Sequence, residues 1–535
     1  DADSVIRLID GVIRGGVIGG EGTLSLSSLA RLENLTIESE SEILAGTTSN
    51  CELQGTFVND GTIRMAGSTQ AQKAIFRMDG PVALEGSGQL VITTDKENAL
   101  TYLNGVATTD LLTNGVDHTI SVLSGMRGSL YQMPVTNNGV ITSEGDFQIY
   151  DLNLDNNGII EATGPSGISF GAFGQVVIEN AGGSLRSSPG GSLKMINAVV
   201  RGGVIDGGGV FGLSGSNTTL ENVTIDWGTT AGAGWAANVT ARGTIINNGT
   251  YVMAGTGTQS AKSLLRMGGP VTFDGSGKIQ VTTNQENFID LLTVGSTADS
   301  LTIGPNQTLE IIPGARCYLS RTPVTFNGHV EAAGLFQVET PTPVNTGTMR
   351  IPSGGRIQMG LFSNADLTNI GGEIRVETGG EFHLNRGSVI GGQNTGGVLF
   401  RAGNPSRHSH GVMLDDTRIY LGSASYITIA DTLTTDGLID LAGSTRAQQA
   451  RIQCDGTVNF DGAGTLRVLN GNENYVTRRT NAATDNLVLG PDFDFEVVDD
   501  GWFYCDIQMT VPGEFRNNGR CFFVGAAPAL VTTPT

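Results

Sequence analysis

The chain has 535 residues and a formal net charge of −21, and it lacks the clustered lysines and arginines that a nucleic-acid partner would require. Glycine contributes 78 residues, 39% of the chain is hydrophobic and only 16% is charged, which excludes a disordered or collagen-like protein. No apolar run approaches the roughly 20 residues that cross a bilayer, so we expect no membrane insertion. Short β-branched runs separated by glycine, asparagine and aspartate instead predict an all-β protein.

Several strand-like runs return along the chain at a long, nearly constant spacing. Arg-Gly-Gly-Val-Ile at residue 14 returns at 201, and as Arg-Gly-Ser-Val-Ile at 386, which are steps of 187 and 185 residues. Leu-Glu-Asn-Leu-Thr-Ile at 32–37 returns as Leu-Glu-Asn-Val-Thr-Ile at 220–225. Glu-Asn pairs begin at 97, 286 and 473. We therefore expect three sequence copies, at 1–200, 201–385 and 386–535, the third being incomplete and ending in an exit strand or linker.

A finer period lies inside the copies. Gly139 and Gly158 each follow an asparagine and are 19 residues apart, and Gly328 and Gly347 repeat that spacing in the second copy. A 19-residue step that holds two or three short strands matches one turn of a parallel β-helix. Asn-Gly also favours two-residue hairpins, so an antiparallel meander is the main alternative. The short flanking strands and the constant register favour a right-handed parallel β-helix (β-solenoid) of about three large tandem repeats.

Two consequences of this fold concern asparagines and chain ends. Asn59, Asn138, Asn157 and Asn248 recur at turns, where they can stack as internal ladders, although ordinary turn chemistry is the favoured explanation. No amphipathic helix is present to cover either end of the solenoid. Because an uncovered coil is an open sheet edge, either the chain is a fragment of a longer one or neighbouring subunits cover each other's ends, and we expect end-to-end self-association.

One segment of the third copy carries side chains suited to acid–base chemistry. Residues 407–416 include His408, His410, Asp415 and Asp416. Enzymes of the β-helix class that cleave polysaccharides gather carboxylates with basic residues on one face of the coils, where paired carboxylates act as acid and base. We interpret the segment as an exposed loop, with a saccharide site as the alternative, and we expect no catalytic residues.

A second candidate site lies near the C-terminal end of the chain. Alternation along a strand would put Asp492, Asp494 and Glu496 on one face, which makes them weak calcium candidates. The corresponding residues 306–310 are mostly uncharged, so a solvated strand face is the favoured interpretation and no cofactor other than calcium is considered. Cys505 and Cys521 are close enough in sequence to lie on neighbouring coils, but free buried thiols are favoured over a disulfide.

The Asn-x-Gly-Thr-Ile turns, Gly-Ser-Gly corners and Leu-Glu-Asn-Val-Thr-Ile strands resemble those of large bacterial surface β-helix proteins, such as filamentous-haemagglutinin-like adhesins and autotransporter passenger domains. This resemblance covers nearly the whole chain, but its motifs are architectural. It implies an extracellular or bacterial cell-surface location and a non-catalytic role as a filament, stalk or adhesin subunit.

Two other functions stay open at this stage. One is a carbohydrate-binding or carbohydrate-cleaving β-helix protein of the tailspike or polysaccharide-lyase type, with a surface polysaccharide as partner. The other is an ice-binding solenoid, although paired threonines such as Thr93-Thr94 are too sparse for a regular ice-binding face.

Overall fold

The computed structural model describes most of the chain. The described residues are 4–46, 48–67, 72–96, 98–103, 110–215, 217–234, 237–255, 262–285, 287–295, 298–385, 387–395, 399–402, 406–409, 412–415, 418–421, 426–444, 449–469, 473–479, 485–523 and 530–531. Within 387–388, 394–418, 431 and 530–531 only the backbone is described.

Every regular element in the described part of the chain is a β-strand, from β1 to β65, and no helix that could cross a membrane occurs there. The strands fall into two compact units. Unit 1 comprises Asp1–Thr256 and Ser260–Arg266, and unit 2 comprises Gly257–Gln259 and Met267–Thr535. This division differs from the three sequence copies, whose boundaries stay a prediction.

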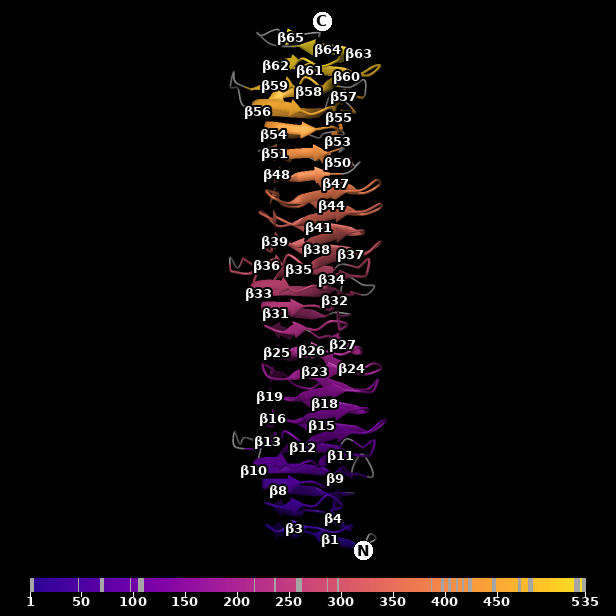
Figure 1. Ribbon diagram of the computed structural model, residues 1–535, viewed down its shortest axis with the longest axis vertical. Helices are drawn as coiled ribbons and strands as arrows, with labels where there is room; N and C mark the ends of the chain where they lie inside the picture. Colours follow the sequence, from indigo (N-terminus) through magenta and orange to yellow (C-terminus); the bar gives the residue numbers. More distant parts are fainter. Residues whose placement is uncertain are drawn as a thin grey trace. The chain divides into compact units, whose positions relative to one another are not determined.

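The first coil of unit 1 illustrates how the chain winds. It consists of β1 (Val5–Ile9), β2 (Val12–Arg14) and β3 (Val17–Ile18). These strands pair in parallel with β4 (Thr23–Ser27), β5 (Arg31–Glu33) and β6 (Thr36–Ile37) of the next coil, respectively. Each of these strands therefore pairs with the third strand after it, so the coil has three sides. Within unit 1 the strands stack on one another in chain order (Figure 1).

The parallel pairing extends through both units, which confirms the predicted β-solenoid and excludes the antiparallel meander. In unit 1, Val140 pairs with Ile159, which is the predicted 19-residue step. Thr62 pairs with Gln89 and Gln89 with Thr119, because longer loops enlarge these coils. The right-handed winding and the number of repeats stay predictions.

Long strands mark the same place in each sequence copy. Each copy has one pair of strands of ten to twelve residues on neighbouring coils, and the pairs begin near residues 50, 238 and 426. The three pairs are β8 (Asn50–Asn59) with β10 (Ile75–Glu85), β31 (Asn238–Asn247) with β33 (Ser263–Asp274), and β54 (Tyr426–Thr435) with β56 (Ala450–Asp461).

The second long strand of each pair, β10, β33 or β56, bends at a glycine, and a buried carboxylate holds the bend. Gly80 in β10 has a φ of 77° and donates its backbone N–H to Asp110 Oδ1 at 2.9 Å. The backbone N–H groups of Gly269 and Gly456 donate in the same way to Asp299 and Asp485, at 2.8 and 2.9 Å. The acceptor carboxylates are buried, so these aspartates have a structural role that the sequence reading did not identify.

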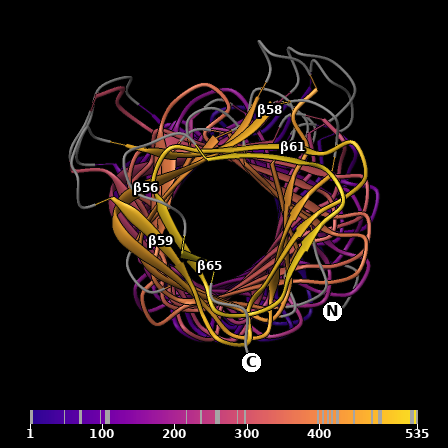
Figure 2. The ribbon, with the colours of Figure 1, turned by 90° about the horizontal axis from the view of Figure 1, so that it is seen from above.

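The strands form the wall of each coil (Figure 2). Inside this wall, the core consists of side-chain rows that run from coil to coil. Alternate residues of each strand point inward, and the burial of one aliphatic side chain contributes about 1.5–3 kcal/mol. One row of unit 1 contains, in register, buried aliphatic residues only: Leu24, Ile43, Ile63, Leu90, Ile120, Ile141, Ile160, Leu185 and Ile205.

A ladder of fully buried asparagines runs beside this core in unit 1. Asn114 Nδ2 donates to Asn137 Oδ1 at 2.8 Å, Asn137 to Asn156 at 2.7 Å, and Asn156 to Asn180 at 2.6 Å. At the N-terminal end of the ladder, His118 lies between two asparagines. Its Nδ1 is 2.8 Å from Asn114 Oδ1, and its Nε2 is 3.0 Å from Asn59 Nδ2.

An internal ladder exists, but of the four asparagines named from the sequence only Asn59 reaches it, through His118. In three Asn-Asn pairs the sequence reading named the outer member, Asn138, Asn157 or Asn248, for which the favoured turn chemistry is not contradicted. Asn138 and Asn157 form an outer pair, with a hydrogen bond of 3.1 Å at the surface. The residue that precedes each of these two, Asn137 or Asn156, points inward.

Candidate functional site

The predicted calcium site has a different geometry from the one expected. Strand β60 (Asp494–Val497) begins at Asp494, so Asp492 lies in the preceding turn and only Asp494 and Glu496 share the outer face. Arg516 Nη2 lies 3.9 Å from Asp494 Oδ2. Glu496 stands in register between Arg467 and Arg516. Arginines thus accompany both strand carboxylates, and no group of three potential metal ligands occurs anywhere in the described residues.

The predicted saccharide loop at 407–416 is not a loop in its described parts. His408 lies in β51 (Ser406–Ser409) and Asp415 in β52 (Val412–Asp415), and both strands pair with neighbouring coils. His410 and Asp416 lie outside the described residues, and for His408 and Asp415 only the backbone is described. The expectation of an exposed loop was therefore wrong for these two residues, whereas the saccharide site there stays a prediction.

The five cysteines are all free thiols. In register, Cys505 stands opposite Phe523, and Cys521 stands opposite Phe503, so the two sulfurs do not face each other. Burial raises the pKa of the Cys505 thiol to about 12 and that of Cys521 to about 11. The favoured prediction of free thiols is confirmed, although Cys521 is only partly buried.

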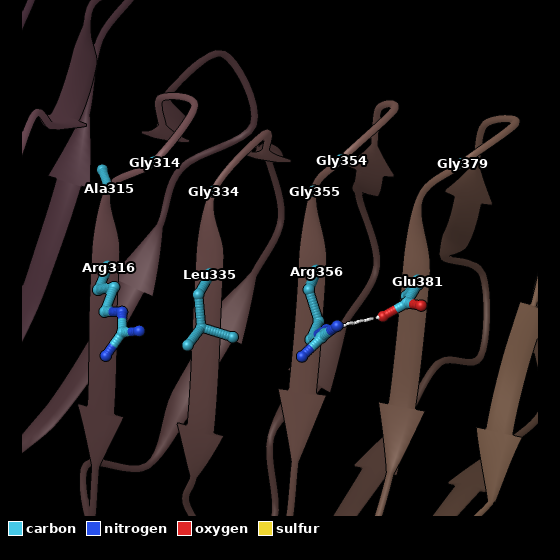
Figure 3. Close-up of a pocket in the computed structure, with 10 residues that line it drawn as sticks. All are labelled: Gly314, Ala315, Arg316, Gly334, Leu335, Gly354, Gly355, Arg356, Gly379 and Glu381. Carbon is cyan, nitrogen blue, oxygen red and sulfur yellow. Dashed lines mark hydrogen bonds and ion pairs between the residues drawn. The ribbon is translucent and has the colours of Figure 1, made fainter. Parts of the chain in front are cut away.

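A groove of about 440 Å³ lies in unit 2 along a row of turns (Figure 3). We call it the glycine groove, because one wall consists of turn glycines: Gly314, Gly334, Gly354, Gly355 and Gly379. The other wall is an outward row of four side chains in register, Arg316, Leu335, Arg356 and Glu381. Arg356 Nε donates to Glu381 Oε2 at 2.8 Å, so the charges of these two residues neutralise each other. Arg316 is the other charged residue of the row.

A second recess, which we call the β15 hollow, lies in unit 1 and has a volume of about 270 Å³. Residues of four strands line it, namely Ile75 of β10 and residues of β12 (Asn98–Tyr102), β15 (Arg127–Tyr131) and β18 (Asp146–Tyr150), and Lys73 and Phe173 complete the lining. Its floor is made by Ala99, Gly128 and Ser129, whose side chains are absent or short. The hollow therefore exists because small residues occupy adjacent outward positions on consecutive coils.

One wall of the β15 hollow is aromatic. The rings of Tyr131 and Tyr150 stack with centroids 5.1 Å apart and planes within 1°. Phe173 meets Tyr150 edge-on at 5.1 Å and is 72% exposed. Tyr150 covers one face of Tyr131, and both rings line the hollow.

The other wall is polar and its groups are held in place by one carboxylate. Arg127 Nε donates to Asp146 Oδ2 at 3.1 Å, and Gln148 Nε2 donates to the same oxygen at 3.3 Å. Ser129 Oγ, on the floor, donates to the backbone carbonyl of Asn98 at 3.4 Å. The rim thus combines guanidinium, amide and carboxylate groups, which provide donors and acceptors within one small recess.

The first sequence copy differs from the second at the floor of the hollow. Buried asparagines, Asn98, Asn287 and Asn474, mark the same position in the three copies. The next residue is Ala99 in the first copy but Phe288 in the second. The alanine therefore opens a space that an aromatic ring occupies in the second copy.

The next coil repeats this difference. Ser129, which pairs with Ala99, stands where the second copy has Tyr318 paired with Phe288. Phe288 and Tyr318 stack at 5.0 Å, and in the third copy Tyr475 and Tyr504 stack at 4.9 Å. Two of the three copies thus fill with stacked rings the space that remains open in the first.

The sequence reading missed this site, although the signal was available. The Glu-Asn pairs at 97, 286 and 473 align the copies, and the residues that follow are alanine, phenylalanine and tyrosine. The constant spacing of these pairs reveals the repeat, whereas the differences between the copies at the next position indicate the site.

Comparisons with known proteins give no further identification. No protein-family model matches the chain, and none of the curated proteins is significantly similar to it.

Proposed function

We propose that the protein is a non-catalytic extracellular structural protein of a bacterial cell surface, a filament, stalk or adhesin subunit that assembles through the edges of its coils. One observation carries this proposal, namely that successive coils stack through parallel strands and inward rows of aliphatic side chains, so that one coil is a fitting partner for another. We call β1, β2 and β3, which pair with the following coil, the edge strands.

Apolar side chains gather on the edge strands. Ile6 and Leu8 stand in register with Leu24 and Leu26 of the next coil, which are fully buried core residues. Ile6 is 70% exposed. Other exposed aliphatic residues of the same coil are Val5, Ile9, Val12 and Val17, at 54–63%.

A further coil of the same kind is the partner that fits the edge strands. It would supply parallel backbone hydrogen bonds and a matching row of aliphatic side chains. The net charge of −21 opposes lateral clustering, which favours stacking along the coil axis over sideways aggregation. An internally braced solenoid with buried asparagine ladders also suits a load-carrying stalk.

Sedimentation velocity of the purified chain tests the proposal. The variant Ile6→Lys places a charge in the edge row, whereas Val116→Lys changes an exposed valine, 74% exposed, in a turn of unit 1 away from the edge. We expect concentration-dependent association of the native chain and of Val116→Lys, and loss of association in Ile6→Lys. A native chain that sediments as a monomer at all concentrations would refute the proposal.

A carbohydrate-binding role is the second candidate function, and the β15 hollow is the observation that favours it. Aromatic and polar walls around a small recess are the usual composition of small-molecule sites. This role is compatible with an adhesin that binds a surface polysaccharide through its lateral face.

A further inference from the structure

We propose that the β15 hollow binds one pyranose ring of an uncharged glycan, stacked against Tyr131. The inference deepens the carbohydrate-binding candidate and does not depend on the proposed assembly through coil edges.

The size of the hollow selects a single ring. A volume of about 270 Å³ lies below the range of about 300–1,000 Å³ that is typical for drug-sized ligands. The lining belongs to several neighbouring coils, from Lys73 and Ile75 to Phe173.

The two walls match the two kinds of surface on a sugar. A pyranose presents a face of C–H groups, which packs on an aromatic ring, and a rim of hydroxyl groups, which both donate and accept hydrogen bonds. Tyr131 and Phe173 provide the aromatic surface. Arg127 provides N–H donors, while Asp146 and Gln148 provide oxygen acceptors, as hydroxyl recognition requires.

The polar wall is ordered before a ligand arrives. Because Asp146 accepts hydrogen bonds from both Arg127 and Gln148, little side-chain freedom remains to be lost on binding. The Arg127–Asp146 pair is neutral as a unit, and Lys73, which also lines the hollow, adds one positive charge. The chain as a whole carries a net charge of −21, which repels a uronate or a sulfated glycan and so favours an uncharged sugar.

The other sequence copies provide the variant that tests this assignment. The double substitution Ala99→Phe, Ser129→Tyr introduces the residues that form the Phe288–Tyr318 stack in the second copy. The same backbone positions tolerate these rings there, so the variant is expected to fold while its hollow is filled. Tyr318→Ser, which changes the second copy and leaves the hollow intact, is the matched control.

The probe is an array of neutral gluco-, manno- and galacto-oligosaccharides, followed by titration of the best binder by NMR. We expect the native chain and Tyr318→Ser to bind at least one of them with a dissociation constant of about 1 mM or lower. The filled variant is expected to bind at least about tenfold more weakly. Tyr131→Ala, which removes the stacking face without filling the space, is expected to weaken binding to a similar extent.

Three results would overturn the inference: no binding of any neutral oligosaccharide, unchanged binding by the filled variant, or binding of peptides alone at the hollow. Circular dichroism and thermal melting of each variant show whether it is folded. Sedimentation of the filled variant stays unchanged whether or not sugar binds, so failure of this inference is distinct from failure of the assembly proposal.

Discussion

The asparagine ladder predicts a sharp difference between two adjacent asparagines. Asn137 is fully buried, accepts a hydrogen bond from Asn114 and donates one to Asn156. Asn138, the next residue, lies at the surface and accepts one hydrogen bond from Asn157. Substitution of each by alanine therefore removes the same chemical group from opposite sides of one turn.

The magnitude follows from the partners that are left behind. Asn137→Ala removes two ladder hydrogen bonds and leaves Asn156 Oδ1 without its ladder donor inside the core, and an unsatisfied buried group costs about 1–3 kcal/mol. With the lost packing of the amide, the local free energy of opening falls by about 3 kcal/mol. Asn138→Ala is expected to cost about 0.5 kcal/mol, as is usual at a surface.

Hydrogen exchange followed by mass spectrometry measures the free energy of opening of individual segments, which suits a solenoid because its coils can open independently. The informative peptides cover β17 (Val140–Ser143) and β20 (Ile159–Ala162), which flank the altered rung. We expect about 100-fold faster exchange there in Asn137→Ala and little change in Asn138→Ala. Equal effects of the two substitutions, or none at Asn137, would refute the ladder's role in stability.

Three further predictions concern single groups. Burial lowers the pKa of His118 to about 4 from 6.5, so the folded state binds fewer protons than the unfolded state between these values. The contribution of His118 to the free energy of unfolding is therefore fully present above pH 6.5 and falls by about 3 kcal/mol as the pH is lowered through this window. Denaturation curves should lose this pH dependence in His118→Gln, which introduces the residue found at Gln307 in the second sequence copy. An unchanged pH dependence in this variant would exclude His118 as its origin. Asp110→Ala leaves the Gly80 N–H without its acceptor and should destabilise β10 by about 1–2 kcal/mol, measured by thermal melting. Asp110→Asn retains an acceptor oxygen and should destabilise it less. Equal losses of stability in the two variants would contradict the role of Asp110 in holding the bend at Gly80. Alkylation of the native protein should modify Cys521 first, because the other thiols are buried and need unfolding; intact-mass analysis that detects a disulfide or rapid labelling of Cys317 would contradict the structure.

The sequence was sufficient for the fold because a solenoid is specified locally. Each coil needs only inward aliphatic residues in alternation and turn residues at its corners, and both leave a periodic trace such as the step from Gly139 to Gly158. Which asparagine of a pair points inward depends on where the strand ends. Asn137 is the last residue of β16 (Val135–Asn137), and a boundary error of one residue reverses its direction.

The candidate site was less predictable because it depends on what is missing. Motif searches favour charged and titratable residues, which led to Asp492 and to the segment 407–416. The β15 hollow instead arises from Ala99 and Ser129, two residues that carry no chemistry of their own. Their meaning emerges only when register brings them together and the stacked rings at Phe288 and Tyr318 are seen at the corresponding place.

Electron microscopy of the purified native chain, with and without a calcium chelator, tests the proposed role most directly. End-to-end filaments of uniform width, unchanged by the chelator and absent in Ile6→Lys, are the result expected for a subunit that stacks through its coil edges. Discrete single particles of the native chain under both conditions would contradict the assembly proposal.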